Sequence, residues 1–303
     1  MSPTSADHPL DAVSSTAQKD GSVYPLLPTE EERNRLYVLN VILLNALGDI
    51  QMHAPVDLSK TGAAVLESGT GPGFWLIDLA KVTPVEVELV GIDISASFFP
   101  APETIPPNLT FKQMSIASLP TEWTNKFTLV HQRFLFAAMR FSEWVTAIGN
   151  IYNVLQPGGW FQLFEIDDWI STGPMLKSFS LSQENLVKAW GGEGLFPHGY
   201  IAWKKMMEDV GFVNIRITFP ETPVGKWAGK AGEGHQQNVV TLLKGTKSDI
   251  LRRGGLGIVN DAEEYDRWAA GVQKEIEEGD TKPGARWVMI CAQKPVDNLR
   301  EKE

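Results

Sequence analysis

The sequence predicts an α/β protein with a doubly wound, mostly parallel sheet. Short apolar runs suited to buried parallel strands alternate with segments whose apolar residues recur at helical spacing. The first apolar run, residues 63–66, passes through a glycine-rich loop into an apolar helical segment over residues 74–80. Strand, glycine turn and helix in this order are typical of a sheet that binds its ligand at the carboxyl ends of the strands.

The chain before the glycine loop predicts a tail, an arm and one helix. Residues 1–22 are rich in Ser, Thr, Asp and Pro without periodicity, so we expect a disordered tail. Residues 24–28 predict an extended arm. Thr29 precedes three glutamates and then leucines at 3.6-residue spacing, which indicates a helix with Thr29 as its N-cap. We therefore divide the chain into the tail, an arm and helix over residues 23–60, and a main domain over residues 61–303.

The main domain is expected to contain seven strands that are mostly separated by helices. A proline-rich loop over residues 98–107 replaces one connecting helix. After the fifth strand the spacing of the apolar residues mostly predicts helices, and it predicts a strand only twice more. The expected strands are residues 65–67, 88–93, 109–114, 127–131, 160–165, 212–219 and 286–292, and the expected helices are residues 74–81, 143–155, 182–190, 200–210, 235–244 and 262–278.

The glycine loop and the two acids beside it indicate which cofactor the sheet binds. A dinucleotide fingerprint spaces its glycines G-x-G-x-x-G around a pyrophosphate, whereas Gly69, Gly71 and Gly73 follow G-x-G-x-G. Glu67, two residues before the loop, would repel a pyrophosphate and would suit a cation. S-adenosylmethionine (SAM) carries an ammonium and a sulfonium and has no phosphate, so the charges favour SAM. Asp93 closes the second strand, where an acid accepts hydrogen bonds from a ribose diol.

Several blocks in a fixed order carry a resemblance to a known family. Because it contains these sequence blocks, the chain resembles the class I, Rossmann-like SAM-dependent methyltransferases. It is most similar to the fungal secondary-metabolism group that includes the gliotoxin thiomethyltransferase and the velvet-complex methyltransferase. Two positions depart from the family pattern, because Glu67 replaces an Asp and Ser115 replaces the acid after the third strand. The blocks are Tyr24-Pro25-Leu26-Leu27-Pro28, Leu66-Glu67-Ser68-Gly69-Thr70-Gly71, Val130-His131-Gln132-Arg133 and Leu155-Gln156-Pro157-Gly158-Gly159-Trp160.

The resemblance implies further detail about the fold and the contacts. It implies a seven-stranded sheet with an antiparallel end, and a helical insertion over about residues 225–285 that walls the substrate pocket. The N-terminal helix would cover the cofactor, or would pack for stability alone. Gln132 and Arg133 would face the substrate. The residues expected to contact SAM are Tyr24, Glu67, Ser68, Gly69, Thr70, Gly71, Gly73, Asp93, Ile94, Met114, Ser115, Ile116 and His131.

These residues also have purely structural interpretations. The glycines could form only a tight turn, and Asp93 could cap the segment that follows it. Met114 could pack without selecting a ligand. His131 and Arg133 could anchor helices through hydrogen bonds, because family resemblance alone does not make a residue catalytic.

The sequence leaves the general base for methyl transfer open. The candidates are Asp167, beside Asp168 just past the fifth strand, and His198 and His235 on the helical cover. A thiol acceptor needs little help because it is appreciably ionised near neutral pH, so S-methylation of a gliotoxin-like dithiol is the sharpest expectation. The alternatives are O- or N-methylation of another metabolite, a SAM-binding regulatory protein, and a SAM-binding fold recruited for another reaction.

Composition narrows the partners and the compartment. A formal net charge of −10 argues against nucleic acid and against an anionic membrane surface, which leaves a small-molecule substrate. No apolar run approaches the ~20 residues of a membrane span, and no secretory signal is visible, so we expect a cytoplasmic protein. Cys291 is the only cysteine and no His-and-acid cluster is evident, so we expect no metal. The oligomeric state stays open.

Overall fold

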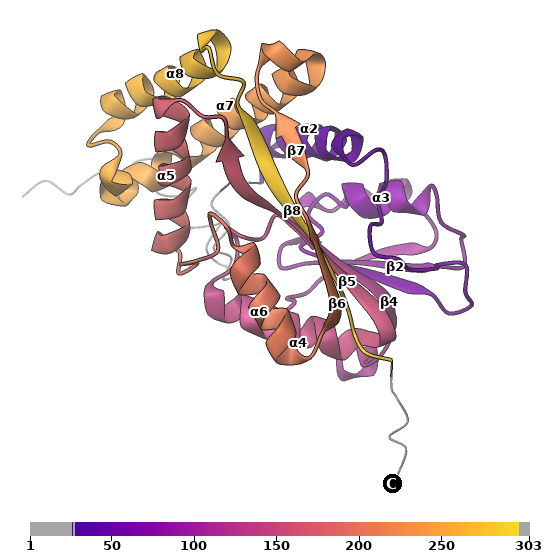
Figure 1. Ribbon diagram of the computed structural model, residues 1–303. Coiled ribbons are helices and arrows are strands. Elements are labelled where there is room, and N and C mark those ends of the chain that lie inside the picture. Colours follow the sequence, from indigo (N-terminus) through magenta and orange to yellow (C-terminus); the bar gives the residue numbers. More distant parts are fainter. Residues whose placement is uncertain (1–25, 27, 297–303) are drawn as a thin grey trace, which may run out of the picture.

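The computed structural model describes residue 26 and residues 28–296 (Figure 1). The expected tail over residues 1–22, and Tyr24, lie outside the described residues. One sheet runs through the molecule in the order β3-β2-β1-β4-β5-β8-β6, and the short strand β7 also pairs with β8. The strands are β1 (Ala64–Ser68), β2 (Glu88–Asp93), β3 (Leu109–Gln113), β4 (Phe127–Arg133), β5 (Leu155–Ile170), β6 (Val213–Thr218), β7 (Glu221–Pro223) and β8 (Gly284–Gln293).

The sheet is parallel from β3 to β5 and antiparallel at its other end. β1 pairs in parallel with β2 and β4, and β8 runs antiparallel to both β5 and β6. The mostly parallel sheet with an antiparallel end is therefore confirmed. Strand order reverses between β1 and β4, so the connections that follow these strands diverge and leave a crevice at their carboxyl ends.

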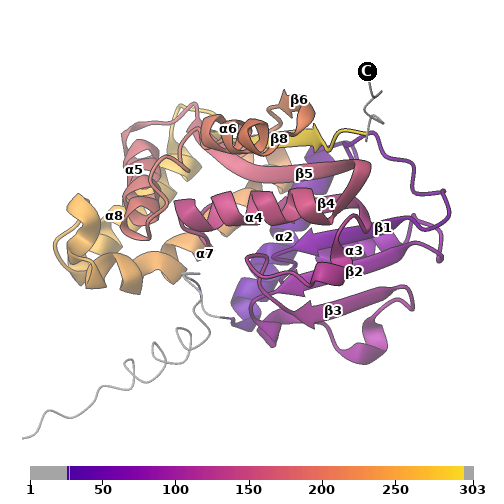
Figure 2. The ribbon, with the colours of Figure 1, turned by 90° about the horizontal axis from the view of Figure 1, so that it is seen from below.

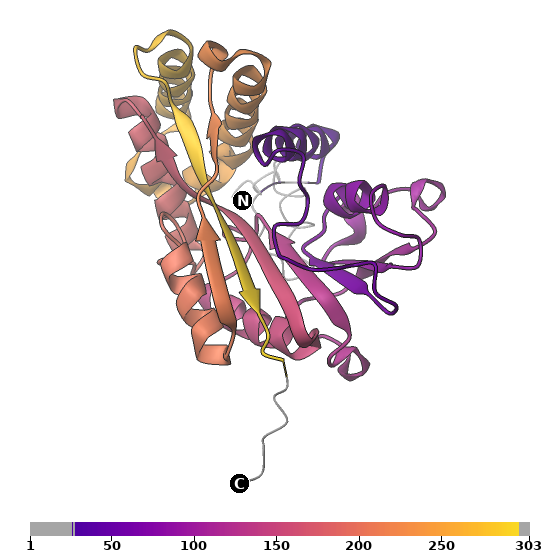
Figure 3. The same cartoon turned by 45° about the vertical axis from the view of Figure 1, so that its right-hand side comes forward.

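Helices cover both faces of this sheet. α2 and α3 pack on one face, whereas α4 and α6 pack together on the other (Figure 3). α5, α7 and α8 gather beyond one end of the sheet, as the view from below makes clear (Figure 2). The helices are α2 (Glu30–Ala46), α3 (Phe74–Ala80), α4 (Phe141–Val154), α5 (Pro174–Ala189), α6 (Tyr200–Val210), α7 (Gly229–Arg252) and α8 (Ala262–Glu278).

Local sequence signals explain where several helices begin. The Thr29 side chain accepts a hydrogen bond from the Glu32 amide, so the expected N-cap of α2 is confirmed. α5 begins at Pro174, earlier than the expected residue 182. Proline suits the first turn of a helix, and the Glu275 carboxylate accepts the amide hydrogens of the next two residues, Met175 and Leu176.

The fifth strand is longer than its apolar run predicts. β5 continues to Ile170 because its second half pairs with β8, down to the pair Ile170 and Gly284. The expectation that this strand ends at residue 165 was wrong, and Asp167 and Asp168 therefore lie within a strand. Within the described ranges, no helix combines the length and the apolarity needed to cross a bilayer.

Candidate functional site

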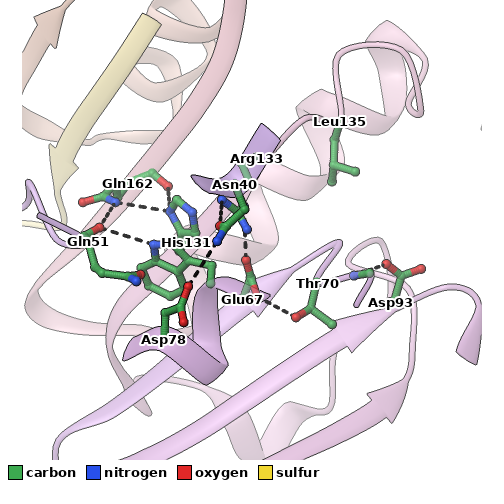
Figure 4. Close-up of polar contacts among 12 residues, drawn as sticks. Asn40, Gln51, Glu67, Thr70, Asp78, Asp93, His131, Arg133, Leu135 and Gln162 are labelled. Carbon is green, nitrogen blue, oxygen red and sulfur yellow. Dashed lines mark hydrogen bonds and ion pairs between the residues drawn. The ribbon is translucent and has the colours of Figure 1, made fainter. Parts of the chain in front are cut away.

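Glu67 lies at the carboxyl end of β1, at the crevice between β1 and β4. Its side chain is buried, with 1% exposure. Thr70 Oγ1 donates a hydrogen bond of 2.5 Å to Glu67 Oε2, and Arg133 Nε lies 3.7 Å from Glu67 Oε1 (Figure 4). Burial raises the pKa of Glu67 to about 7, against the opposing effects of Arg133 and Thr70. A further cation bound beside this carboxyl group would favour its ionised form.

Arg133, at the end of β4, connects Glu67 to two helices. Its Nη1 donates to Asn40 Oδ1 on α2 at 2.9 Å, and Asn40 Nδ2 donates to Asp78 Oδ2 on α3 at 3.1 Å (Figure 4). Asn40 is buried in the middle of α2. The network fixes α2 over the face of the sheet that carries Glu67, so this helix forms one wall of the crevice.

The glycine loop takes a backbone conformation that other residues rarely adopt. Gly69, Gly71 and Gly73 have φ values of 64°, 50° and 74°. The Gly71 amide donates a hydrogen bond of 2.9 Å to Asp93 Oδ2, and the Ser95 amide donates to Asp93 Oδ1 at 3.0 Å. These bonds hold the carboxylate at the end of β2 beside the loop, and its oxygens have further lone pairs for hydroxyl donors.

The segment after β3 lies next to Asp93. The Met114 amide donates to the Asp93 carbonyl at 2.7 Å. Met114 and Ser115 are half-buried, Ile116 is buried, and Ile94 keeps an exposed fraction of 37%. The loops after β2 and β3 therefore bring these residues together, and their expected contact with the adenine base stays a prediction.

Residues 131–133 alternate between the two faces of β4. His131 is buried, its ring stacks on Trp75 with centroids 3.9 Å apart, and its Nδ1 lies 3.1 Å from the Gln162 carbonyl. Burial lowers the pKa of His131 well below its usual value. Gln132 lies on the opposite face, paired in register with Ser68; among the described residues neither of these two buried side chains has a hydrogen-bond partner. Gln132 and Arg133 therefore lie on different faces of the strand, although both were expected to face the substrate.

A largely apolar cavity opens beside this crevice, and the space in it, counted together with the solvent at its mouth, is about 830 Å³. Its wall includes Phe134 and Phe136, which directly follow β4. Leu135, between them, packs against the glycine loop, because a Cβ placed on Gly69 would lie 2.7 Å from Leu135 Cδ2. The residues that line the cavity are Leu26, Arg35, Leu36, Leu39, Phe134, Phe136, Ala137, Ile166, Trp169, Gln183, Trp190, Phe196, His235, Asn238, Val239, Leu242, Thr246 and Trp287.

The three candidate bases occupy different places. His235, on α7, lines the cavity, and its Nδ1 lies 3.1 Å from Thr222 Oγ1. Burial lowers the pKa of His235 to about 4, so the imidazole is neutral at physiological pH. Asp167 is buried and accepts a hydrogen bond of 2.7 Å from Arg286 Nε, and His198 lies 3.5 Å from the same carboxylate oxygen. Neither Asp167 nor His198 is among the residues that line the cavity.

Comparison with known proteins agrees with this geometry. A family model described as a methyltransferase domain matches residues 65–159. The N-methyltransferase sirN of Leptosphaeria maculans is 33% identical over 218 residues, which cover 69% of this chain and 72% of that protein. The chain belongs to the class I SAM-dependent methyltransferases of fungal secondary metabolism. The N-methyltransferase tcpN of Claviceps purpurea is 28% identical over 87% of this chain and 93% of its own length. The N-methyltransferase gliN of Aspergillus fumigatus is 28% identical over 84% and 91%.

The methyltransferase is therefore an enzyme that uses SAM. The described residues fit that cofactor chemically, since a buried carboxyl group, a glycine loop that is open at Gly71 and a second acid lie along one crevice. Sequence reasoning missed Trp75, Asp78 and Leu135. No role was predicted for Asn40 either. A single polar residue on the apolar face of a helix could have indicated a buried hydrogen-bond partner at this position.

SAM affinity should depend on pH through Glu67. Since the pKa of Glu67 is raised to about 7, much of the free protein carries the protonated carboxyl group below that pH, and a bound cation favours the ionised form. We expect the dissociation constant of SAM to fall as pH rises from about 6 to about 8, by up to about tenfold per pH unit below the pKa. Calorimetric titrations across this range would measure it. If the dissociation constant of SAM does not change with pH in the wild type, or changes equally in Glu67→Gln, then Glu67 is not the group that causes the pH dependence.

Proposed function

We propose that this methyltransferase transfers the methyl group of SAM to a nitrogen atom of a small, largely apolar metabolite held in the cavity. The observation that carries the proposal is the wall between the two parts of the site. Phe134, Phe136 and Ala137 line the cavity, and Leu135 between them packs on the glycine loop. A substrate in the cavity would lie next to the cofactor. Direct displacement at the methyl carbon requires a nucleophile in line at roughly 3 Å, and such a cavity would supply that alignment and exclude water.

The choice of nitrogen rests on the relatives, and the choice of an apolar substrate rests on the cavity. The relatives sirN, tcpN and gliN are all named as N-methyltransferases. The one arginine in the lining, Arg35, is already bound, with its Nε 2.6 Å from Glu32 and its Nη1 3.2 Å from Asn238 Oδ1. The rest of the lining is aromatic, aliphatic or neutral polar, with His235 neutral. This lining favours an uncharged substrate with aromatic or aliphatic groups.

An acceptor panel tests the proposal. The full chain would be incubated with SAM labelled in the methyl group and with matched apolar compounds that carry a secondary amine, an amide, a phenol or a dithiol. We expect label on nitrogen. Label on the dithiol alone would establish S-methylation, the expectation from the sequence, and would overturn the proposed acceptor atom. Label on none of the compounds while SAM still binds would favour a regulatory protein.

Within this proposal the neutral His235 contacts the acceptor group and orients it through a hydrogen bond, because a ring with a pKa of about 4 is too weak a base to hold the proton of an amine. It lines the cavity, and Thr222 Oγ1, which accepts a hydrogen bond of 2.8 Å from Trp287 Nε1, orients its ring. We expect His235→Phe, which keeps a ring of similar size but loses the hydrogen bond that orients the acceptor, to lower kcat by about 100-fold with SAM affinity unchanged. His198→Phe is the matched control and should keep kcat. If kcat falls in His198→Phe and stays unchanged in His235→Phe, then His198 has this role and His235 does not.

A further inference from the structure

The segment that follows β4 holds a strained turn around Phe134. Phe134 has a φ of 60°, which is costly for a residue with a large side chain. Strain of this kind persists only where the surroundings fix the backbone, and it concentrates at functional sites. Here the turn lies between the two parts of the site, because Leu135 packs on Gly69 while Phe134 and Phe136 line the cavity.

Glu165 fixes the backbone of this turn. Its carboxylate accepts the Leu135 amide at 2.7 Å on Oε1 and the Phe136 amide at 3.4 Å on Oε2. The side chain is completely buried, so its hydrogen bonds replace the water that an ionised carboxylate would otherwise bind. Burial raises the pKa of Glu165 to about 8 and the backbone amides oppose this effect.

Two features that lower the stability of the fold thus occur together. One is a buried carboxyl group whose oxygens accept two backbone amides, and the other is an aromatic residue in the left-handed region. A hydrophobic residue at position 165 would remove the first cost, and a turn with glycine at position 134 would remove the second. Neither feature is needed to pair β4 with β5, because the Phe134 amide already continues that ladder to the Phe164 carbonyl at 3.3 Å. What the two features set together is the place of Leu135 and Phe136.

We infer that Glu165 is a positioning residue that holds residues 134–137 as the common wall of the cofactor crevice and the substrate cavity. Its two amide contacts set the direction of Leu135 toward the glycine loop and of Phe136 toward the cavity. Phe136 continues this wall to Phe196, whose ring centroid is 5.6 Å away. The role rests on the proposed function, since it assumes that SAM lies against the glycine loop and substrate lies in the cavity.

A matched pair of carboxylates in the chain separates positioning from simple stabilisation. Glu275 also accepts two backbone amides, those of Met175 and Leu176 at 2.9 and 2.8 Å, but it caps α5 and does not line the cavity. Glu165→Gln and Glu275→Gln each replace one carboxyl oxygen by an amide nitrogen and so remove one acceptor from such a pair. The full chain carrying each change would be compared in thermal unfolding and in calorimetric binding of S-adenosylhomocysteine, the demethylated form of the cofactor.

Both variants should lose stability, but only Glu165→Gln should weaken S-adenosylhomocysteine binding, by about tenfold or more. Equal binding by Glu165→Gln and wild type, or an equal loss in Glu275→Gln, would overturn the inference. If Glu165→Gln does not fold, Leu135→Ala tests the same wall, and unchanged binding in that variant would also overturn it. Failure of the proposed function has a different signature, because the wild type would then still bind S-adenosylhomocysteine while the acceptor panel showed no label on nitrogen.

Discussion

Glu67→Gln should weaken SAM binding by about 100-fold, roughly 3 kcal/mol, while the protein stays folded. The amide oxygen of Gln can still accept the hydrogen bond that Thr70 donates. The charge is lost, however, and the partly buried Arg133 guanidinium then lies beside the cationic cofactor without the carboxylate that offsets it. The dissociation constant of SAM, measured by calorimetry, is the direct readout.

A second carboxylate provides the control for this prediction. Glu88, at the start of β2, pairs with Lys126 at 2.7 Å and is 51% exposed, outside the crevice. Glu88→Gln removes the same charge and should leave SAM affinity within about twofold of wild type, because an exposed ion pair contributes little. If Glu67→Gln also binds SAM like the wild type, Glu67 does not hold the cofactor.

Gly73→Ala should destabilise the protein by about 3 kcal/mol and abolish detectable SAM binding. Gly73 has a φ of 74°, and an added Cβ would lie 2.3 Å from the Phe111 ring. The substitution therefore adds a steric overlap to an unfavourable backbone conformation. A shift of the backbone that relieved the overlap with Phe111 or the unfavourable φ would move the glycine loop relative to Asp93. Chemical denaturation and SAM titration would measure the two effects separately.

Gly62 separates the two causes. It has a φ of 81°, but nothing lies within 4 Å of the position of an added Cβ. Gly62→Ala should lower the free energy of unfolding by only about 1 kcal/mol, the cost of placing alanine at a positive φ, and should leave SAM binding intact. Equal losses of stability in Gly62→Ala and Gly73→Ala would mean that the contact with Phe111 has no part in shaping the loop.

The parts of the fold that depend on neighbouring residues could be predicted from the sequence. The N-cap at Thr29, the loop from Gly69 to Gly73 and the acid at Asp93 follow from local backbone and hydrogen-bond rules. The structure bears out the cap and the loop, with the Thr29 cap formed and all three glycines at positive φ, and the contact of Asp93 with a ribose stays a prediction. The proline-rich loop over residues 98–107 likewise contains only short 3-10 turns.

The rest depends on pairing between distant segments. The length of β5 is set by its partner β8, more than 100 residues away in the sequence, and this pairing places Asp167 inside a strand. Alternation along β4 then separates Gln132 from Arg133, a consequence of where the strand ends that the sequence alone does not fix. The Glu165 contact with residues 135 and 136 joins the ends of two neighbouring strands and has no short-range signature.

The most direct test of the account is a calorimetric titration of the wild-type chain with SAM, with NAD as the comparison ligand. We expect saturable binding of SAM at one site per chain and no binding of NAD, because Glu67 attracts a cation and repels a pyrophosphate. Binding of NAD without binding of SAM would contradict it.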